Sequence, residues 1–184
     1  MSAARKPVIV RKLTRDWCAG YAAANLAGDH PEGDNPELEL LLSSGKLLRI
    51  EWSQVKWVCY VRELGGGEAS GNDTVNPERL LRRRFTSRPR IAGVWLRLTL
   101  ADGEELEGVA ANDRSLVDGP GLLLTPPDTR SNTQRVFVPR SSIRELTVLG
   151  VVHPSTPRGD RAGWQPDLFA KDMAGNGQKD EPAL

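Results

Sequence analysis

The chain has 184 residues, of which 39% are hydrophobic and 27% are charged, a composition typical of soluble folded proteins. Its 25 lysine and arginine residues nearly balance 24 aspartate and glutamate residues, and the formal net charge of +1 excludes a protein that coats nucleic acids through its overall charge. No apolar run reaches the length of about 18 residues that a membrane-spanning helix needs, and no signal peptide precedes the first strand-like run, so we expect a cytoplasmic protein without membrane contacts.

Short apolar stretches separated by turns fill residues 6–64. A strand-like run covers residues 8–13, and alternating leucines over residues 37–42 lead into a Ser-Gly turn. Residues 55–61 carry apolar side chains on both of their alternating faces. Short strands at this spacing predict a small antiparallel β-barrel over residues 6–64.

The composition changes over residues 65–91. The stretch at 65–73 is rich in glycine, serine and asparagine, which predicts a flexible linker. Asn76, Pro77 and Glu78 are residue types that favour the start of a helix, and we expect a short basic helix of about two turns after them.

Arginines gather on this predicted helix and just beyond it. Leu80, Leu81 and Phe85 share one side of a helical wheel, whereas most of the arginines lie on the other side. Two interpretations stay open: the arginines bind phosphate groups, or they form only the solvated face of a helix whose apolar face packs on a barrel.

The strand pattern restarts over residues 92–152. Apolar residues alternate from Val94 to Leu100, and an Asp102-Gly103 pair then predicts a hairpin turn. "GLLLTPP" and "QRVFVPRSSIRELTVLGVV" complete this second set of strands.

The two sets of strands look like copies of one unit. Val8 aligns with Val94 at an offset of 86 residues, and the stretch 53–56 aligns with 141–144 at an offset of 88. The fold that we expect is therefore mainly β: two tandem small antiparallel β-barrels at 6–64 and 92–152, joined by a flexible linker and short helix at 65–91.

The last part of the chain, residues 153–184, is rich in proline, glycine and charge and has no periodic apolar pattern. We expect a disordered tail there, because it cannot bury enough apolar surface to offset the entropy of ordering. Within it, Trp164, Leu168 and Phe169 form a candidate stripe for docking a partner.

Several stretches resemble known families of small barrels. "VWLRLTLADGEELEG" resembles the first hairpin of Sm-like and SH3-like barrels, and "RVFVPRSSIRELTVL" resembles their closing strand pair. "LLLTPPDTRSNTQRVFVPRSSI" is similar to a family of uncharacterised bacterial proteins with two such units, some loosely described as PilZ-like. The resemblance covers residues 6–62 and 92–152, and it implies the fold without implying an activity.

The Sm resemblance implies RNA binding through two loops, which here are Asn112–Ser115 and Pro139–Ser142. Sm proteins have glycine after the arginine of the second loop, whereas Ser141 follows Arg140 in this chain.

The PilZ resemblance implies binding of cyclic-di-GMP through an Arg-x-x-x-Arg stretch and an Asp/Asn-x-Ser-x-x-Gly turn. Arg79 with Arg83, and Arg84 with Arg88, have the first spacing, and Asp113 and Ser115 begin the second motif. The candidate ligand-binding residues are Arg79, Arg82, Arg83, Arg84, Arg88, Arg90, Asp113, Ser115 and Arg140.

The sequence shows no catalytic signature. It has no Gly-x-Ser-x-Gly motif and no phosphate-binding glycine loop, and His30 and His153 have no partners at metal-ligand spacing. Cys18 and Cys59 lack that spacing too, and we expect them to be reduced thiols. We expect a non-catalytic cytoplasmic binding or adaptor protein without cofactor or metal. Its partner would be a protein or an anionic ligand, for which a PilZ-type cyclic-di-GMP receptor and an Sm-like RNA binder are the alternatives.

Overall fold

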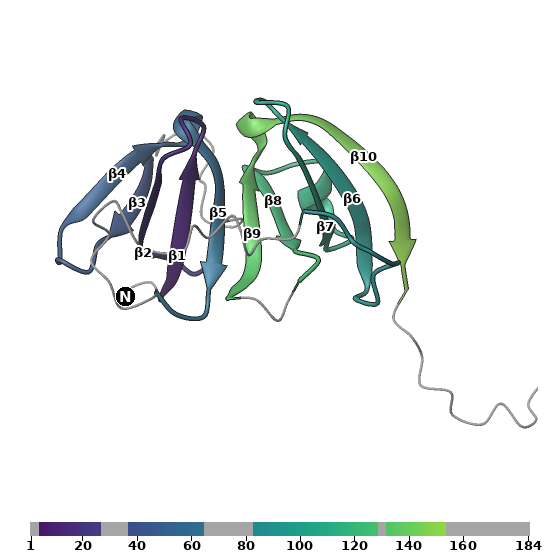
Figure 1. Cartoon of the computed structure of the whole chain (residues 1–184), viewed down its shortest axis with the longest axis horizontal. Coiled ribbons are helices and arrows are strands. Elements are labelled where there is room, and N and C mark those ends of the chain that lie inside the picture. Colours follow the sequence, from purple (N-terminus) through teal and green to yellow (C-terminus); the bar gives the residue numbers. More distant parts are fainter. Residues whose placement is uncertain (1–3, 27–36, 65–82, 129–131, 154–184) are drawn as a thin grey trace, which may run out of the picture.

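The computed structural model of the chain describes residues 4–26, 37–64, 83–128 and 132–153, and these residues form an antiparallel β-protein (Figure 1). Its strands are β1 (Arg5–Lys12), β2 (Trp17–Ala23), β3 (Glu37–Leu41), β4 (Leu47–Glu51), β5 (Val55–Val61), β6 (Gly93–Leu100), β7 (Glu105–Ala110), β8 (Gly121–Thr125), β9 (Thr133–Pro139) and β10 (Ile143–Val152). Three short 3₁₀ turns accompany them: η1 (Trp52–Gln54), η2 (Arg114–Leu116) and η3 (Arg140–Ser142). Within these ranges the chain contains no α-helix, and the prediction of a mainly antiparallel β-protein is confirmed.

The ten strands hydrogen-bond in one continuous sheet, in the order β10-β6-β7-β8-β9-β5-β1-β2-β3-β4. The first half (β1–β5) and the second half (β6–β10) lie side by side, and β5 and β9 meet between them (Figure 1). The sequence predicts two separate barrels, whereas the hydrogen bonds run without a break from one half into the other. The pairing of β5 with β9, called here the β5–β9 seam, is the feature of the architecture that the strand pattern does not predict.

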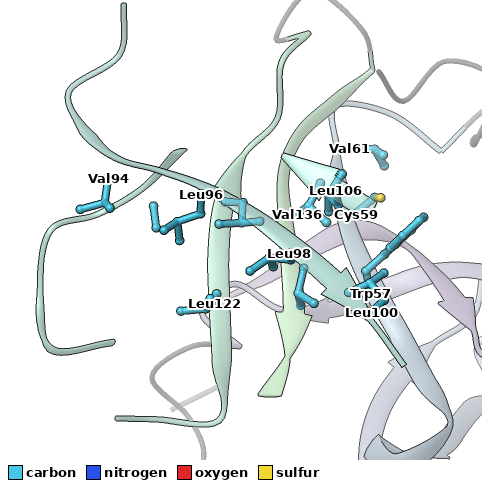
Figure 2. Close-up of a cluster of buried hydrophobic side chains, with 13 residues drawn as sticks. Trp57, Cys59, Val61, Val94, Leu96, Leu98, Leu100, Leu106, Leu122 and Val136 are labelled. Atoms are coloured by element: carbon cyan, nitrogen blue, oxygen red, sulfur yellow. The ribbon is translucent and has the colours of Figure 1, made fainter. Parts of the chain in front are cut away.

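Strand β5 is buried on both faces because it contributes to two cores. All seven of its residues are buried. Val58 and Tyr60 pack in the core of the first half, whereas Trp57 and Cys59 pack in the core of the second half (Figure 2). Strand β9 does the same, since Phe137 belongs to the first core and the residues on either side of it belong to the second. Strand β5 therefore supplies apolar side chains to the core of the second half, and β9 supplies Phe137 to the core of the first half.

Polar contacts close both ends of the β5–β9 seam. At one end, the buried ammonium of Lys56 forms ion pairs with Asp102 and, at 2.6 Å, with Glu104 in the β6–β7 turn. The Ser142 hydroxyl donates to the Lys56 carbonyl over 2.9 Å. At the other end, the Asn132 side chain accepts hydrogen bonds from the main chain just after β5 and donates one back to Glu63 over 2.8 Å.

The two halves correspond residue by residue in their first turns. The backbone N–H of Leu13 donates to the carbonyl of Gln54 over 2.9 Å, and the N–H of Ala101 donates to the carbonyl of Ser142 over the same distance. Both donor and acceptor differ by 88 residues between the halves. Arg15 has a positive φ of 72°, and Gly103, again 88 residues later, has a φ of 82°.

The strand registers repeat at the same offset. Val8 pairs with Tyr60 in the first half, and Leu96 pairs with Val148 in the second. The alignment of Val8 with Val94 at an offset of 86 is therefore two residues out of register, because in the hydrogen-bonded sheet Leu96 holds the place of Val8. The third strands of the halves, β3 and β8, differ in this respect. Tyr21 pairs with Leu41, and Val109, 88 residues after Tyr21, pairs with Thr125, so that the third strands correspond at an offset of 84.

The predicted linker and helix fall mostly outside the described residues, as does the predicted tail at 153–184 apart from His153. The last residues of the predicted helix, Arg83–Phe85, are described and are not helical. Their main chain is bonded instead to β7: the N–H of Glu107 donates to the Arg83 carbonyl over 2.7 Å, and the N–H of Phe85 donates to the Glu107 carboxylate over 3.1 Å. The Phe85 N–H, which the last turn of a helix would bond to the carbonyl four residues earlier, is therefore bonded to Glu107 instead.

Removal of the Lys56 ammonium tests the polar contacts of the seam. Because Lys56→Ala leaves two carboxylates beside an apolar core without their cation, we expect it to lower the free energy of unfolding by about 3 kcal/mol. Urea denaturation measures the change. The matched control is Arg84→Ala, which breaks an exposed ion pair with Glu105 and should cost less than about 1 kcal/mol. Equal losses from the two variants would contradict this role of Lys56.

Candidate binding surfaces

The arginine segment, residues 83–90, lies against β6 and β7. Besides the main-chain contacts with Glu107, the Phe85 ring packs edge to face on Trp95, with ring centroids 5.9 Å apart and planes at 77°. Pro89 is buried, whereas the residues on either side of it are exposed. The segment thus has an apolar side that packs on the second half and a polar side that meets solvent.

Most of the described arginines in this segment are already bonded within the chain. Arg83 forms an ion pair with Glu104 at 3.1 Å, and Arg84 forms one with Glu105. Arg88 donates to the carbonyl of Val151 over 2.9 Å, which ties the segment to β10. Arg90 is exposed and has no ion pair or side-chain hydrogen bond with the described part of the chain. Arg79 and Arg82 lie outside the described residues, as do Trp164, Leu168 and Phe169.

Glu107 on β7 holds the arginine segment in place through its carboxylate and its main chain. Its carboxylate is buried and accepts from the guanidinium of Arg97 at 2.8 Å and from the N–H of Phe85. Burial alone would raise the pKa of Glu107, but the hydrogen bonds from Arg97 and Phe85 and the charge of Arg97 outweigh it and hold the pKa below its usual 4.5. The glutamate is therefore a charged anchor, and no signal in the sequence distinguishes it from Glu105, which is half-buried.

The other predicted site residues, Asp113, Ser115 and Arg140, lie close together. Asp113 caps η2 by accepting hydrogen bonds from the N–H and the hydroxyl of Ser115, at 2.9 Å and 2.6 Å. The guanidinium of Arg140 reaches the same loop and donates to the carbonyls of Ser115, at 2.9 Å, and Gly119, at 3.1 Å. The hydrogen bonds from Ser115 lower the pKa of Asp113. Arg140 thus joins the two loops that the Sm resemblance implies. Its guanidinium donates hydrogen bonds to backbone carbonyls of the loop that follows Asp113.

In the described residues, no hydrogen bond or ion pair links this loop cluster with the arginine segment. Arg83 and Arg84 bind acidic residues near the β6–β7 turn, and Arg88 binds β10, whereas Asp113 and Ser115 bond to each other and to Arg140. The candidate residues therefore form two separate groups, and their role in ligand binding stays a prediction.

Exposed apolar residues mark the two edges of the sheet, a surface whose residues sequence reasoning did not identify. In the described chain no strand pairs with the outer side of β4 or of β10, which are the two ends of the sheet. Val148 on β10 is 57% exposed and Leu47 on β4 is 46% exposed. A signal was present in "TVLGVV", because apolar residues on both faces of a strand are typical of strands that are covered on both sides.

Within the residues that the structure describes, no group of histidine, cysteine, aspartate or glutamate side chains could hold a metal ion. The same residues include no helix that is both long and apolar enough to cross a membrane.

Residues 4–150 match the model of a family described as "Family of unknown function (DUF6982)". The match covers all ten strands apart from the last residues of β10, and the chain belongs to this family. No curated protein and no solved structure matches the chain.

Acid titration tests the anchoring role of Glu107. A carboxylate with a lowered pKa stabilises the fold above the pKa of the unfolded chain, and this contribution is lost as the pH falls through the folded pKa. We therefore expect wild-type stability to decrease between about pH 5 and pH 3, and Glu107→Gln to show a smaller decrease over that range. At neutral pH, Glu107→Gln should lower the free energy of unfolding by about 2 kcal/mol.

The matched control is Glu105→Gln on the same strand, whose carboxylate pairs with the exposed Arg84. At neutral pH it should lower the free energy of unfolding by less than about 1 kcal/mol. An unchanged pH profile in Glu107→Gln would contradict the assignment.

Proposed function

We propose that the chain is a non-catalytic binding or adaptor protein of the cytoplasm, built from a duplicated small β-barrel unit, and that the two outer strands of its sheet bind partner chains. The observation that carries the proposal is the pair of sheet ends, β4 and β10, each with an exposed apolar residue on its edge strand. An edge strand with unpaired backbone groups can accept a strand from another chain, with pockets or apolar contacts that supply specificity.

The duplication is supported by details that a chance resemblance would not repeat. Gly20 and Gly108 are 88 residues apart, and a Cβ atom at either would come within 2.7 Å of a leucine side chain, Leu40 or Leu124. Both glycines thus allow the first hairpin of their half to approach the third strand of that half. Each half also has its own buried core and the strand order fifth-first-second-third-fourth.

The two buried charges of the described chain support a structural role for these two groups. Lys56 and Glu107 are the buried charged residues of the described chain, and both are paired with opposite charges that connect segments of the fold. Catalysis would require a titratable group directed into an open site, whereas these groups bind the seam and the arginine segment.

A site-specific photo-crosslinker tests binding at the sheet end. Placed at position 148 on β10, it should give covalent adducts when the protein is irradiated in an extract of the cells that naturally make it, because that side chain projects from the edge strand. Position 117 is the matched control, since Val117 is 86% exposed but lies in the loop between η2 and β8. Equal labelling at both positions, or none at 148, would contradict the proposal.

Binding of an anionic ligand is the second candidate function, and the meeting of Asp113, Ser115 and Arg140 favours it. If this loop binds cyclic-di-GMP, a calorimetric titration should give a one-site isotherm that is lost in Arg140→Ala and kept in Arg49→Ala, an arginine exposed on β4. A parallel titration with an RNA oligonucleotide tests the RNA alternative, whose affinity should fall steeply with salt. The absence of heat with both ligands would exclude this candidate.

A further inference from the structure

We propose that copies of this chain associate head to tail, with β10 of one copy paired antiparallel to β4 of the next, in the register that already joins the two halves through the β5–β9 seam. The inference rests on the proposed function in taking the sheet ends as binding surfaces, and it names their partner as a second copy of the chain.

The two free edges are the structural counterparts of the two strands in the seam. The seam joins the fifth strand of the first half, β5, to the fourth strand of the second half, β9. The free ends of the sheet are the fourth strand of the first half, β4, and the fifth strand of the second half, β10. Each molecule therefore has two free edges: β10, which corresponds to β5 of the seam, and β4, which corresponds to β9.

The offset of 88 residues converts the seam into an explicit register between copies. Tyr60 lies opposite Arg135 in the seam. The counterpart of Tyr60 is Val148, because the two residues hold the same place in the strand registers of their halves. Strands β4 and β9 also correspond at an offset of 88, since Ile50 and Val138 hold the same place in their registers. The counterpart of Arg135 is therefore Leu47. The transferred register places Val148 of one copy opposite Leu47 of the next.

This register brings exposed apolar side chains into contact. Val148 and Leu47 are among the few large hydrophobic residues of the described chain that are exposed, at 57% and 46%. They come from opposite ends of the sheet, and nothing in the fold of a single copy requires them to match. Cross-strand pairs of apolar residues stabilise sheets, so their coincidence in the transferred register supports a second copy as the occupant.

The ion pair at the end of the seam also has charged counterparts near the two free edges. In the seam, Lys56 of β5 forms an ion pair with Glu104 after the first strand of the second half. The counterparts 88 residues away are Arg144 on β10 and Asp16 after β1, and both are exposed. In the assembly Arg144 of one copy would face Asp16 of the next, with the same sign at each position as in the seam.

Three polar substitutions make the interface between copies weaker than the seam, because the residues that complete a core across it, Trp57, Cys59 and Phe137, correspond to Glu145, Thr147 and Arg49. Phe137 of the seam is buried in the first core, and its counterpart on β4 is Arg49, which forms ion pairs with Glu39 at 3.5 Å and Glu37 at 4.0 Å. A charged residue on an edge strand limits uncontrolled pairing. We therefore expect reversible association that depends on concentration.

The symmetry of the contact predicts the type of assembly. Because β10 binds β4, each copy keeps one open edge after pairing, and the contact leads to a ring or to an extending chain. A dimer that closes on itself through two copies of β10 would require a different contact.

Sedimentation velocity of the full chain over a range of concentrations tests the proposal. The wild type should show species larger than a dimer, whereas Val148→Lys and Leu47→Lys should each be monomeric up to a concentration about tenfold higher. Val117→Lys, at an exposed position away from both edges, is the control and should behave as the wild type. Unchanged circular dichroism would show that the variants fold.

Mixing the two edge variants gives a sharper result. Val148→Lys keeps an intact β4 and Leu47→Lys keeps an intact β10, so the mixture should form a one-to-one dimer and nothing larger. A Leu47→Lys variant that dimerises alone would show contact between like edges and overturn the head-to-tail arrangement.

Cross-linking tests the register. A chain with both Leu47→Cys and Val148→Cys should form intermolecular disulfides under mild oxidation, since residues directly opposite in antiparallel strands have Cβ atoms about 4.5–5.5 Å apart. Glu51→Cys with Val148→Cys places the second thiol four residues out of register and should give few cross-links. A wild type that is monomeric at all concentrations, or equal cross-linking in both pairs, would overturn the inference; adducts at position 148 with a different protein would still support the proposed binding function.

Discussion

The pairing of β5 with β9 is the constraint on which the rest of the structure depends. Alternate residues of these two strands enter different cores, so that Phe137 packs with the first half and its neighbours pack with the second. A change in this register by one residue would exchange the side chains that face each core. The seam therefore fixes the relative position of the halves and completes the packing of both.

The distribution of charge follows from the same architecture. Lys56 on β5 is neutralised by two carboxylates of the β6–β7 turn, which connects the ends of the two halves. The same turn also binds Arg83, and Glu107 binds Arg97 and the main chain of Phe85. The chain is nearly neutral because it has 25 basic and 24 acidic residues. Arg83, Arg84 and Arg97 have acidic partners in the fold, so the arginine density at 82–90 is by itself a poor guide to ligand binding.

The sequence predicts the local structure well and the long-range pairing poorly. The alternation in β6 and the Asp102-Gly103 pair correctly predict the first hairpin of the second half, where Gly103 adopts a positive φ. Alternation shows which face of a strand is apolar, but it does not show which strand lies across its edge, and so β5 and β9 could not be paired in advance. The apolar character of both faces of β5 was a usable signal that this strand is covered twice.

Two further differences have physical causes. The pattern of leucines and arginines before Phe85 favours a helix, but the described end of this stretch, Arg83–Phe85, is not helical because its backbone bonds to Glu107. The first turns of the halves have little sequence identity, so aligning Val8 with Val94 by their side chains misses the true hydrogen-bond register by two residues. In the candidate site, Arg140 and Ser115 could be selected from the resemblance, whereas Glu107 and Val148 depend on burial and edge position that only the fold supplies.

Native-state hydrogen exchange is the most direct test of the β5–β9 seam. If the seam holds both cores together, the amides of β5 and β9 that bond across it should exchange only through global unfolding and should share the highest protection in the molecule. Amides of β5 and β9 that exchange at a lower free energy than those of the β6–β7 hairpin would show that the halves separate while each stays folded, and would contradict the account.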